Sequence, residues 1–278
     1  MLSDDGIEMP FMGGAQEIEA RIIARSEGIL VGCAAVDHML QIWAGGISIS
    51  WSHGDGRSVA SGDEIAVLRG DREAILAMER PILNLLGQLS GIATEAKKWA
   101  SIAPGQIACT RKTIWGVLDK WAVHLGGGLT HRLSKTDAMM IKENDLATMY
   151  PDIDGHGPRI VKFLGEVSPA DCGAFLEVEV REDKEAIMAA FTWSERRMID
   201  GLDRLVIMLD NFNPERCKSI ADELTEMGLR DAVWLEASGG ILLENLEDWR
   251  ECGLDVLSTS TINRGTKPLD VSMLVDGA

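Results

Sequence analysis

The stretch RLVIMLDNFNPERCKSIADELTEMGLRDAVWLEASGG (204–240) decides the fold, because it holds a strand, a helix and a second strand in succession. Its first run, RLVIMLD (204–210), is short and apolar, as expected for a buried strand. PERCKSIADELTEMG (214–228) has helical spacing, and AVWLEAS (232–238) is again strand-like. Repeated strand–helix–strand spacing of this kind predicts parallel strands covered by helices.

The same alternation continues on both sides of this stretch. The other strand-like runs are QIACT (106–110), AMMIK (138–142), AFLEVEV (174–180) and LDVLSTS (254–260). The helical patterns between them are VLDKWAVHLG, GPRIVKFLGEV, DKEAIMAAFTWSERRM and ILLENLEDWRECG. Six such strands fit either an incomplete α/β barrel or an open doubly wound sheet, and the periodicity leaves both open.

The residues before Pro104 have a different pattern, which predicts a small α+β domain. EIEARIIARSEGILVG (17–32) alternates as half-buried strands do, residues 33–43 have helical spacing, and residues 47–70 suggest short strands joined by tight turns. From Asp71 the spacing is helical, with Asp71 as the cap and Pro81 expected to kink or break the helix.

We therefore expect an N-terminal α+β sandwich with linking helices over 1–103, preceded by an arm at 1–14. An α/β domain follows over 104–267, and a strand within 268–278 could return to the first domain.

Composition and charge restrict the class of protein. The chain has 278 residues, a formal net charge of -17 and a pI near 4.7, which disfavours nucleic acid as a partner. The N-terminus is acidic and no apolar run reaches membrane-spanning length, so we expect a cytoplasmic protein without membrane attachment. Five scattered cysteines without a CxxC pair predict reduced thiols.

Against this acidic background, the stretch Cys109–Asn144 concentrates positive charge. It contains Arg111, Lys112, Lys120, Arg132, Lys135 and Lys142 against Asp119, Asp137 and Glu143. A solvated basic surface is the ordinary explanation for such a run. Here the charges alternate with glycines and apolar segments, and several stand where a strand should end, so we expect an anion to bind there.

Polar residues also follow the other predicted strands, at the edge where α/β folds build active sites. Glu179 and Asp210 are oxygen donors of the kind that Mg²⁺ prefers, although Glu179 could be a surface residue and Glu177 competes for its role. Ser238-Gly239-Gly240 precedes a helical pattern and suits a phosphate, although it is also a common connection. The chain has no P-loop and no GxGxxG.

Eight short motifs in order resemble the quinolinate phosphoribosyltransferase family, which is also called decarboxylating nicotinate-nucleotide pyrophosphorylase. They are ERPILN (79–84), LSGIAT (89–94), TRKT (110–113), GGGLTHR (126–132), IKEN (141–144), EVEV (177–180), LDNF (209–212) and EASGG (236–240). Each motif is weak alone, but the ordered set is specific. The resemblance implies an N-terminal α/β sandwich, an incomplete α/β barrel and a homodimer with its active site at the interface.

The resemblance also implies a reaction and roles for individual residues. The enzyme would transfer phosphoribosyl from phosphoribosyl pyrophosphate to quinolinate with Mg²⁺ and release CO2, as a step of NAD biosynthesis. Arg111, His131 and Arg132 would hold the quinolinate carboxylates, Lys142 would stand between the two substrates, and Arg80 would come from the partner subunit. Lys112 would contact phosphates, while Glu179 and Asp210 would face the ribose and the metal. The 5′-phosphate would bind at Ser238, Gly239, Gly240, Thr259 and Ser260.

Several positions depart from the family pattern. Asp145 stands where the family usually has His, Ser260 stands at an expected Gly, and residues 192–200 form an insertion that we place on the surface. The Gly-Asp-Thr-Thr motif expected near the start is not recognisable. Two alternatives therefore stay open: a related phosphoribosyltransferase for another aromatic acid, of the type found beside molybdenum transport, and a metabolite-binding regulator without turnover.

Overall fold

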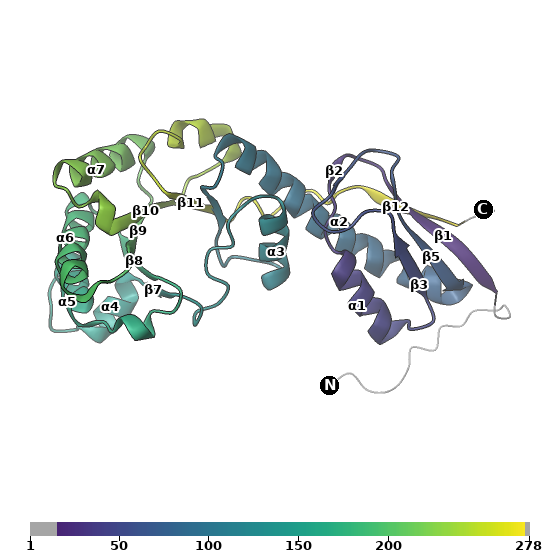
Figure 1. Cartoon of the computed structure of the whole chain (residues 1–278), viewed down its shortest axis with the longest axis horizontal. Coiled ribbons are helices and arrows are strands. Elements are labelled where there is room, and N and C mark those ends of the chain that lie inside the picture. Colours follow the sequence, from purple (N-terminus) through teal and green to yellow (C-terminus); the bar gives the residue numbers. More distant parts are fainter. Residues whose placement is uncertain (1–15, 276–278) are drawn as a thin grey trace. The chain divides into compact units, whose positions relative to one another are not determined.

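The computed structural model describes residues 16–275 and divides the chain into two compact units (Figure 1). Unit 1 consists of Met1–Thr94 with Lys267–Ala278, and unit 2 consists of Glu95–Thr266. The division falls within the long helix α2 (Arg72–Ile102). The arm expected at residues 1–14 lies outside the described residues.

Unit 1 is built on a four-stranded antiparallel sheet with the order β12-β1-β5-β3. Its strands are β1 (Glu17–Ala24), β3 (Ser48–Trp51), β5 (Glu64–Asp71) and β12 (Val271–Val275). A two-stranded ladder joins β2 (Gly28–Ile29) to β4 (Ser58–Val59), and α1 spans Cys33–Trp43. Because β12 pairs with β1, the last described strand does return to the first unit.

The helix α2 begins where the sequence predicts and continues past its proline. The Asp71 carboxylate accepts hydrogen bonds from the backbone N–H groups of Glu73 and Ala74, at 3.0 and 3.1 Å. Pro81 does not divide the element into a helix pair. Proline removes only one helical donor, and the buried Ile82 and Leu86 pack the next turns into the core of unit 1.

Unit 2 is a curled sheet of six parallel strands with the order β6-β11-β10-β9-β8-β7 (Figure 1). The strands are β6 (Ile107–Cys109), β7 (Met139–Ile141), β8 (Leu176–Val180), β9 (Leu205–Asp210), β10 (Val233–Ser238) and β11 (Val256–Thr259). Strands β7 to β11 follow one another in space as in sequence, and β6 then pairs with β11. This cyclic order is that of a barrel opened between β6 and β7, so the incomplete barrel is confirmed and the doubly wound alternative is wrong.

A glycine-rich segment runs along the free side of β6 at this opening. The Leu129 N–H donates to the Ile107 carbonyl at 2.7 Å, and the Cys109 N–H donates to the Leu129 carbonyl at 3.1 Å. Gly128 allows the close approach, because a Cβ there would lie 2.6 Å from the Val123 side chain. The segment therefore delivers the next residues, His131 and Arg132, into the gap between β6 and β7.

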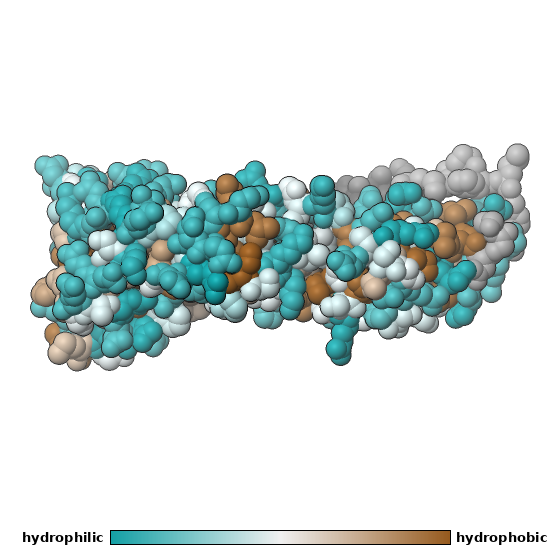
Figure 2. Space-filling model, turned by 90° about the horizontal axis from the view of Figure 1, so that it is seen from above, coloured by the Kyte–Doolittle hydropathy of each residue, from teal (hydrophilic) through white to brown (hydrophobic). Residues whose placement is uncertain are grey.

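Most helices of unit 2 agree with the sequence patterns: α3 (Val117–Leu125), α5 (His156–Glu166), α6 (Asp183–Asp200) and α7 (Pro214–Glu226). The short α4 (Glu143–Met149) was not expected. The helix expected after β10 is instead the 3-10 helix η3 (Leu243–Trp249). Residues 192–200 continue α6, whose last turn exposes Met198 and Ile199 almost completely. No described helix is long and apolar enough to cross a membrane. The face shown in Figure 2 is mostly hydrophilic, with hydrophobic residues in small patches.

Candidate active site

Side chains inside the half-barrel form layers, because alternate residues of a strand point to the same side. On β9 and β10, Val206 and Trp234 line a cavity of about 490 Å³ at the amino ends of the strands. One step further along, Met208 and Glu236 border a cavity of about 260 Å³. The last layer lines a cavity of about 540 Å³ at the carboxyl ends. That edge is where α/β barrels place their active sites.

The 540 Å³ cavity, called here the ribose-phosphate cavity, is lined mainly by polar groups from the strand ends. Its lining includes Thr110, Lys112, Lys142, Glu179, Arg181, Asp210, Asn211, Ser238, Gly239, Gly240, Ser258, Thr259 and Ser260. The 260 Å³ cavity, called here the diacid cavity, is lined by Arg111, His131, Arg132, Met140, Met208 and Glu236 together with groups shared by both. The shared groups are Thr110, Lys112, Lys142, Asp210, Ser238 and Ser258. All of these residues belong to unit 2.

The loop after β10 is shaped so that its backbone borders the ribose-phosphate cavity. Gly239 and Gly240 have φ of 96° and 69°, in the left-handed region that favours glycine. A Cβ on Gly239 would lie 2.3 Å from the Asn211 amide oxygen, while a Cβ on Gly240 would meet nothing within 4 Å. Asn211 itself has φ of 60°, and its N–H donates to the Ser238 carbonyl at 2.8 Å. Strained backbone at two adjacent strand ends is typical of a binding site.

This loop corrects one part of the sequence interpretation. Because η3 starts only at Leu243 and is not an α-helix, the loop does not present an α-helix N-terminus to an anion. Successive residues with positive φ can form a concave nest of backbone N–H groups, so the backbone at Gly239 and Gly240 is the part of the loop that suits an anion. Thr259 lines the cavity, but its hydroxyl donates to the Ile241 carbonyl at 3.3 Å and therefore also joins the two loops.

Lys142 connects the two cavities through an ion pair with Glu179. Glu179 lies next to the last residue of β8 with only 4% of its surface exposed, so the alternative of a surface residue is wrong. Its second oxygen lies 3.5 Å from the Arg181 guanidinium, which in turn pairs with Glu143. Burial, and then the neighbouring Glu179 carboxylate, raise the pKa of Asp210. Charged groups of both signs are thus held close together at this end of the barrel.

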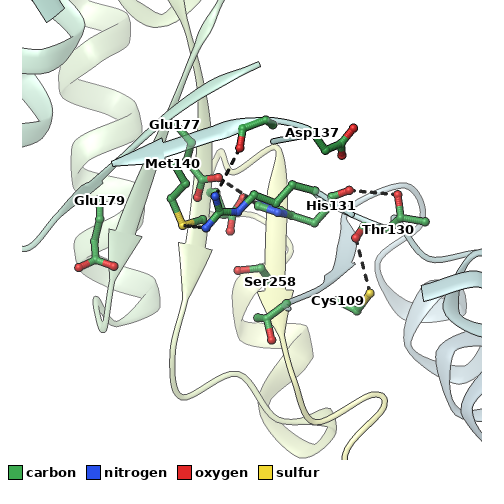
Figure 3. A network of polar contacts seen from close by, with 12 residues as sticks. Cys109, Thr130, His131, Asp137, Met140, Glu177, Glu179 and Ser258 are labelled. Carbon is green, nitrogen blue, oxygen red and sulfur yellow. Dashed lines mark hydrogen bonds and ion pairs between the residues drawn. The ribbon is translucent and has the colours of Figure 1, made fainter. Parts of the chain in front are cut away.

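Four nitrogen donors from the segment Thr110–Arg132 meet at the diacid cavity, namely Arg111, Lys112, His131 and Arg132, and three of them are cations. Arg132 is buried, donates to the Ala138 carbonyl at 3.3 Å and lies 3.0 Å from the Met140 sulfur. His131 has φ of 52°, which turns its ring into the barrel. There Nε2 lies 2.9 Å from Glu236 and 3.3 Å from Glu177. Figure 3 shows His131 and Glu177 within this network of polar contacts. Arg111 stays exposed at the mouth.

Two charged residues of α3 hold this segment in place rather than facing a cavity. Lys120 is 2% exposed, and its ammonium donates to the carbonyls of Cys109 at 3.1 Å and Thr130 at 2.5 Å. The fully buried Asp119 accepts from the N–H groups of Ile114 at 2.9 Å and Trp115 at 3.3 Å. Of the six cations in the basic stretch, Lys120 is therefore structural, Lys135 is exposed, and the other four line the cavities.

Comparison with known proteins identifies the family to which this chain belongs. A family model described as quinolinate phosphoribosyl transferase, C-terminal domain, matches residues 92–274, and its N-terminal counterpart matches residues 10–90. A probable nicotinate-nucleotide pyrophosphorylase (carboxylating) of Methanothermobacter thermautotrophicus is 34% identical over 270 residues, covering 94% of this chain and 89% of that protein. This chain belongs to the quinolinate phosphoribosyltransferase family.

Other relatives agree in name and fold. A chloroplastic nicotinate-nucleotide pyrophosphorylase (carboxylating) of Arabidopsis thaliana is 31% identical over 274 residues, covering 94% of this chain and 74% of that protein. The structure of the nicotinate-nucleotide pyrophosphorylase from Francisella tularensis matches with a TM-score of 0.79 and 29% identity, covering 95% of this chain and 88% of that one. The fold expected for a quinolinate phosphoribosyltransferase is therefore confirmed.

The positions that depart from the family pattern have visible roles in this quinolinate phosphoribosyltransferase. The Asp145 carboxylate accepts from the Lys142 N–H at 3.0 Å, which caps α4 and fixes the backbone that carries Lys142. Asp145 lines neither cavity. Ser260 borders the ribose-phosphate cavity, and its carbonyl accepts from the Arg264 N–H at 2.9 Å.

Other site residues were not assigned a role from the sequence. Arg181, Asn211 and Glu236 all line a cavity, and each directly follows or lies within a motif quoted above. His156 also lies beside the site, with Nε2 3.0 Å from the Glu179 carbonyl. Arg80 belongs to unit 1, where it pairs with Glu79 at 3.1 Å and its side chain is 75% exposed.

Proposed function

We propose that this chain catalyses Mg²⁺-dependent transfer of a phosphoribosyl group from phosphoribosyl pyrophosphate to quinolinate, with decarboxylation. The products are nicotinate mononucleotide, pyrophosphate and CO2. The observation that carries the proposal is the pair of cavities joined at Lys112, Lys142 and Asp210, one cationic and small and the other polar and larger. Membership of the family and the names of the relatives support the same reaction.

The diacid cavity suits a planar aromatic acid with two carboxylates. Guanidinium groups bind carboxylates through paired hydrogen bonds, and Arg111 and Arg132 both border this cavity. Met140 and Met208 supply apolar surface for a ring between these polar groups. Lys142 stands where the diacid and ribose-phosphate cavities meet, so its ammonium would face the reacting ends of both substrates.

The first step is displacement at the anomeric carbon of the ribose. The bond to pyrophosphate breaks, the ring nitrogen of quinolinate supplies the electron pair for the new bond, and pyrophosphate keeps the electrons of the old one. Positive charge develops on the ribose, and the carboxylates of Glu179 and Asp210 would stabilise it. Lys112 and Lys142 would offset the charge of the departing pyrophosphate.

The second step needs no further group from the protein. Once ribosylated, the pyridine nitrogen is cationic, so the ring accepts the electrons of the adjacent carbon–carboxylate bond as CO2 leaves. A proton from solvent then takes the place of CO2 on the ring carbon. Arg111 and Arg132 would hold the remaining carboxylate, which keeps the ring in place during this step.

The carboxyl oxygens that would hold Mg²⁺ are those of Glu179 and Asp210. The donor set fits a hard cation, because both side chains are carboxylates, both border the ribose-phosphate cavity, and the pKa of Asp210 is raised partly by Glu179. Glu179 is paired with Lys142, so Mg²⁺ would share this carboxylate with the Lys142 ammonium. When bound, Mg²⁺ would neutralise charge on the pyrophosphate.

The test is an assay of the purified chain with quinolinate, phosphoribosyl pyrophosphate and Mg²⁺, with nicotinate mononucleotide and CO2 measured directly. Product is expected with quinolinate, and its formation should stop when EDTA removes the metal and resume when Mg²⁺ is added. No product at micromolar enzyme would contradict the proposal. Faster turnover of another aromatic acid would identify the alternative transferase, and quinolinate binding without turnover would identify the regulator.

We also propose a homodimer in which Arg80 of each subunit completes the diacid cavity of the other. On unit 2, the large apolar side chains of Ile114 and Val117 are 62% and 61% exposed directly after Arg111 and Lys112. Exposed apolar groups beside a binding site favour contact with another protein surface. Arg80 is itself an exposed arginine whose ion-pair partner is its sequence neighbour Glu79, at 3.1 Å.

Subunit mixing tests this arrangement. Arg80→Ala and Arg111→Ala chains should each have low activity as pure dimers, because each dimer lacks one guanidinium in both sites. Mixed dimers should regain about a quarter to a half of wild-type activity, since one of their two sites is complete. The control mixes Arg80→Ala chains with chains that carry the exposed-surface substitution Lys135→Ala. It measures exchange of subunits with a partner chain whose Arg111 is intact. No recovery despite confirmed exchange would show that each subunit completes its own site.

A further inference from the structure

The cavity at the amino ends of the strands has no part in the proposed reaction. It measures about 490 Å³, which is within the usual range for small-molecule sites, and it is called here the amino-end cavity. All the residues that line it belong to unit 2. It therefore lies at the opposite end of the same half-barrel from the ribose-phosphate cavity.

The wall of the amino-end cavity is largely apolar and partly aromatic. Phe175, Val206 and Trp234 stand at or just before the amino ends of β8, β9 and β10, and Leu129 borders the cavity from the segment beside β6. The interior of an α/β barrel is usually packed with apolar side chains. Here Trp234 and Leu129 remain 42% and 39% exposed, so this layer of the half-barrel offers an open apolar surface.

Two arginines stand in the lining of this apolar cavity. Arg197 lies in the last turn of α6, and Arg204 directly precedes β9. Arg197 Nη1 and Arg204 Nε both donate to the Asp231 carbonyl, at 3.0 and 3.1 Å, and Arg197 Nε donates to the Leu202 carbonyl at 2.9 Å. The shared acceptor keeps the two guanidiniums close together. Two like charges held in this way are favourable where an anion can join them.

A comparison with similar arginines shows what is distinctive about Arg204. Among residues 16–275, three guanidiniums stack over aromatic rings: Arg196 over Trp193 at 5.7 Å, Arg204 over Trp234 at 5.3 Å, and Arg216 over Phe212 at 3.7 Å. Arg196 and Arg216 also donate to carboxylates, those of Asp200 at 3.3 Å and Asp183 at 2.6 Å. Arg204 bonds a carbonyl instead and forms no ion pair within the described part of the chain.

A purely structural role for the two arginines explains only some of their donors. Their bonds to carbonyls fix the connection between α6 and β9, and they use Nε and Nη1 of Arg197 but only Nε of Arg204. Within residues 16–275, Arg197 Nη2 and both terminal nitrogens of Arg204 make no further hydrogen bond. Asp203 also lines the cavity, but it is exposed and pairs with neither arginine. Donors thus remain for a ligand.

We propose that the amino-end cavity is a second binding site, which takes a small aromatic carboxylate. Its ring would lie against Trp234 and Phe175, and its carboxylate would pair with Arg204, assisted by Arg197. Guanidinium groups suit this role because they bind carboxylates through two parallel hydrogen bonds. The inference goes beyond the proposed reaction and does not depend on it, since neither arginine and neither aromatic ring takes part in that reaction.

The amino-end cavity also shares part of its wall with the diacid cavity. His131 and Glu236 border both cavities. A ligand in the amino-end cavity would therefore contact side chains that also face the diacid cavity, without occupying the diacid cavity itself. Ligands on the two sides of this wall are expected to change each other's affinity by a limited factor rather than to exclude one another.

The first experiment measures binding of 2-naphthoate to the full-length protein by calorimetry. One molecule per chain should bind, with a Kd of about 1 mM or tighter. The uncharged 2-naphthalenemethanol, which has the same ring system, should bind at least about tenfold more weakly. Absence of naphthoate binding would overturn the proposal, and so would equal binding of the two compounds, because the arginines would then have no role.

Variants locate the bound acid. Arg204→Gln should weaken naphthoate binding about tenfold, and Trp234→Ala should weaken it about fivefold. Arg216→Gln is the matched control, because Arg216 also stacks over a ring but lies outside the lining of the cavity. It should bind naphthoate as wild type does, as should Arg111→Ala in the diacid cavity. Thermal unfolding confirms that each variant is folded. Unchanged binding in both Arg204→Gln and Trp234→Ala would overturn the proposal.

Competition with quinolinate separates this proposal from the proposed function. If naphthoate occupies the amino-end cavity, its apparent Kd should level off as quinolinate is raised. A Kd that rises in proportion to quinolinate, together with a loss of binding in Arg111→Ala, would place naphthoate in the diacid cavity and overturn the proposal. If quinolinate neither binds nor turns over, the proposed function fails, while the effects of Arg204→Gln and Trp234→Ala still decide whether the amino-end site exists.

Discussion

The two cavities at the carboxyl end of the half-barrel offer an anion different kinds of group. The diacid cavity relies on side chains, with Arg111, His131 and Arg132 at its wall. The ribose-phosphate cavity relies largely on backbone and hydroxyl groups, with Gly239 and Gly240 in left-handed conformations and Ser238, Thr259 and Ser260 around them. The difference implies that changes of charge should affect the first cavity most, whereas changes of backbone shape should affect the second.

Lys142→Ala should give the largest effect, because Lys142 belongs to both cavities and pairs with the buried Glu179. Loss of one preorganised charge at a reacting centre typically costs about 10²- to 10³-fold in kcat, and the unpaired Glu179 should add to that loss. Steady-state kinetics with both substrates varied would measure it. Lys135→Ala, a lysine of the same stretch that is exposed and lines neither cavity, is the control and should keep wild-type kinetics. Similar losses of kcat in the two variants would contradict a role for Lys142 at the junction of the two cavities.

Asp210→Asn should separate catalysis from stability. We expect kcat to fall about 10²-fold, because the proposed reaction places this carboxylate against the ribose and the metal. The melting temperature at neutral pH should not fall, since the substitution removes one of two neighbouring carboxylates that oppose each other's charge. Thermal unfolding and kinetics on the same preparation would test both parts. A large drop in melting temperature would show that Asp210 has a structural role that the contacts do not reveal.

Arg111→Ala should affect one cavity alone. KM for quinolinate is expected to rise about 10- to 100-fold with the loss of a charged hydrogen-bond donor, while KM for phosphoribosyl pyrophosphate should change less than about threefold. Arg111→Lys should recover only part of the loss, because an ammonium cannot form the paired hydrogen bonds of a guanidinium. Equal changes in the two KM values would contradict the prediction that each cavity binds a different substrate.

Gly239→Ala should affect the other cavity through backbone shape. The added Cβ would meet the Asn211 amide at 2.3 Å in a left-handed conformation, so the loop must shift. KM for phosphoribosyl pyrophosphate should rise about tenfold, with little change for quinolinate. Gly201→Ala is the control, because Gly201 ends α6 with φ of 66° in open space. That variant should lose about 2–4 °C of melting temperature and no affinity.

Asp145→Ala should give the smallest effect. The loss of the cap on α4 should lower the melting temperature by about 2–4 °C, and KM for each substrate should change less than about threefold. Asp145→His would introduce the residue that the family usually has at this position. A large change in KM from either substitution would mean that substrate binding depends strongly on how Asp145 holds the backbone of Lys142.

The sequence predicted the parallel sheet of unit 2 well, because each strand is a short apolar run followed by a polar residue. It did not predict α4, whose seven residues are too few for a helical period to be visible and whose start depends on Asp145. It also predicted a helix after Ser238-Gly239-Gly240, where the structure has a 3-10 helix. Both errors concern connections whose shape is determined by contacts with other loops.

The site residues, like the elements of the fold, were predicted only in part. Charged residues at strand ends, such as Lys142 and Asp210, were visible from spacing because parallel strands end at one edge. The structural role of Lys120 was not visible, since its bonds are to carbonyls that only the fold brings together. Glu177 and Glu236 were equally hidden, because their partner His131 is far from them in sequence and comes from the opening of the barrel.

The opening between β6 and β7 also bears on how this scaffold changes in evolution. In a closed barrel the first and last strands pair with each other, whereas here the two edge strands have three residues each and are not paired with one another. The segment that lines the diacid cavity thus connects two free edges. Insertions or exchanges within it leave the hydrogen-bonded ladder of the other strands unchanged, so new acid specificities are accessible without rebuilding the sheet.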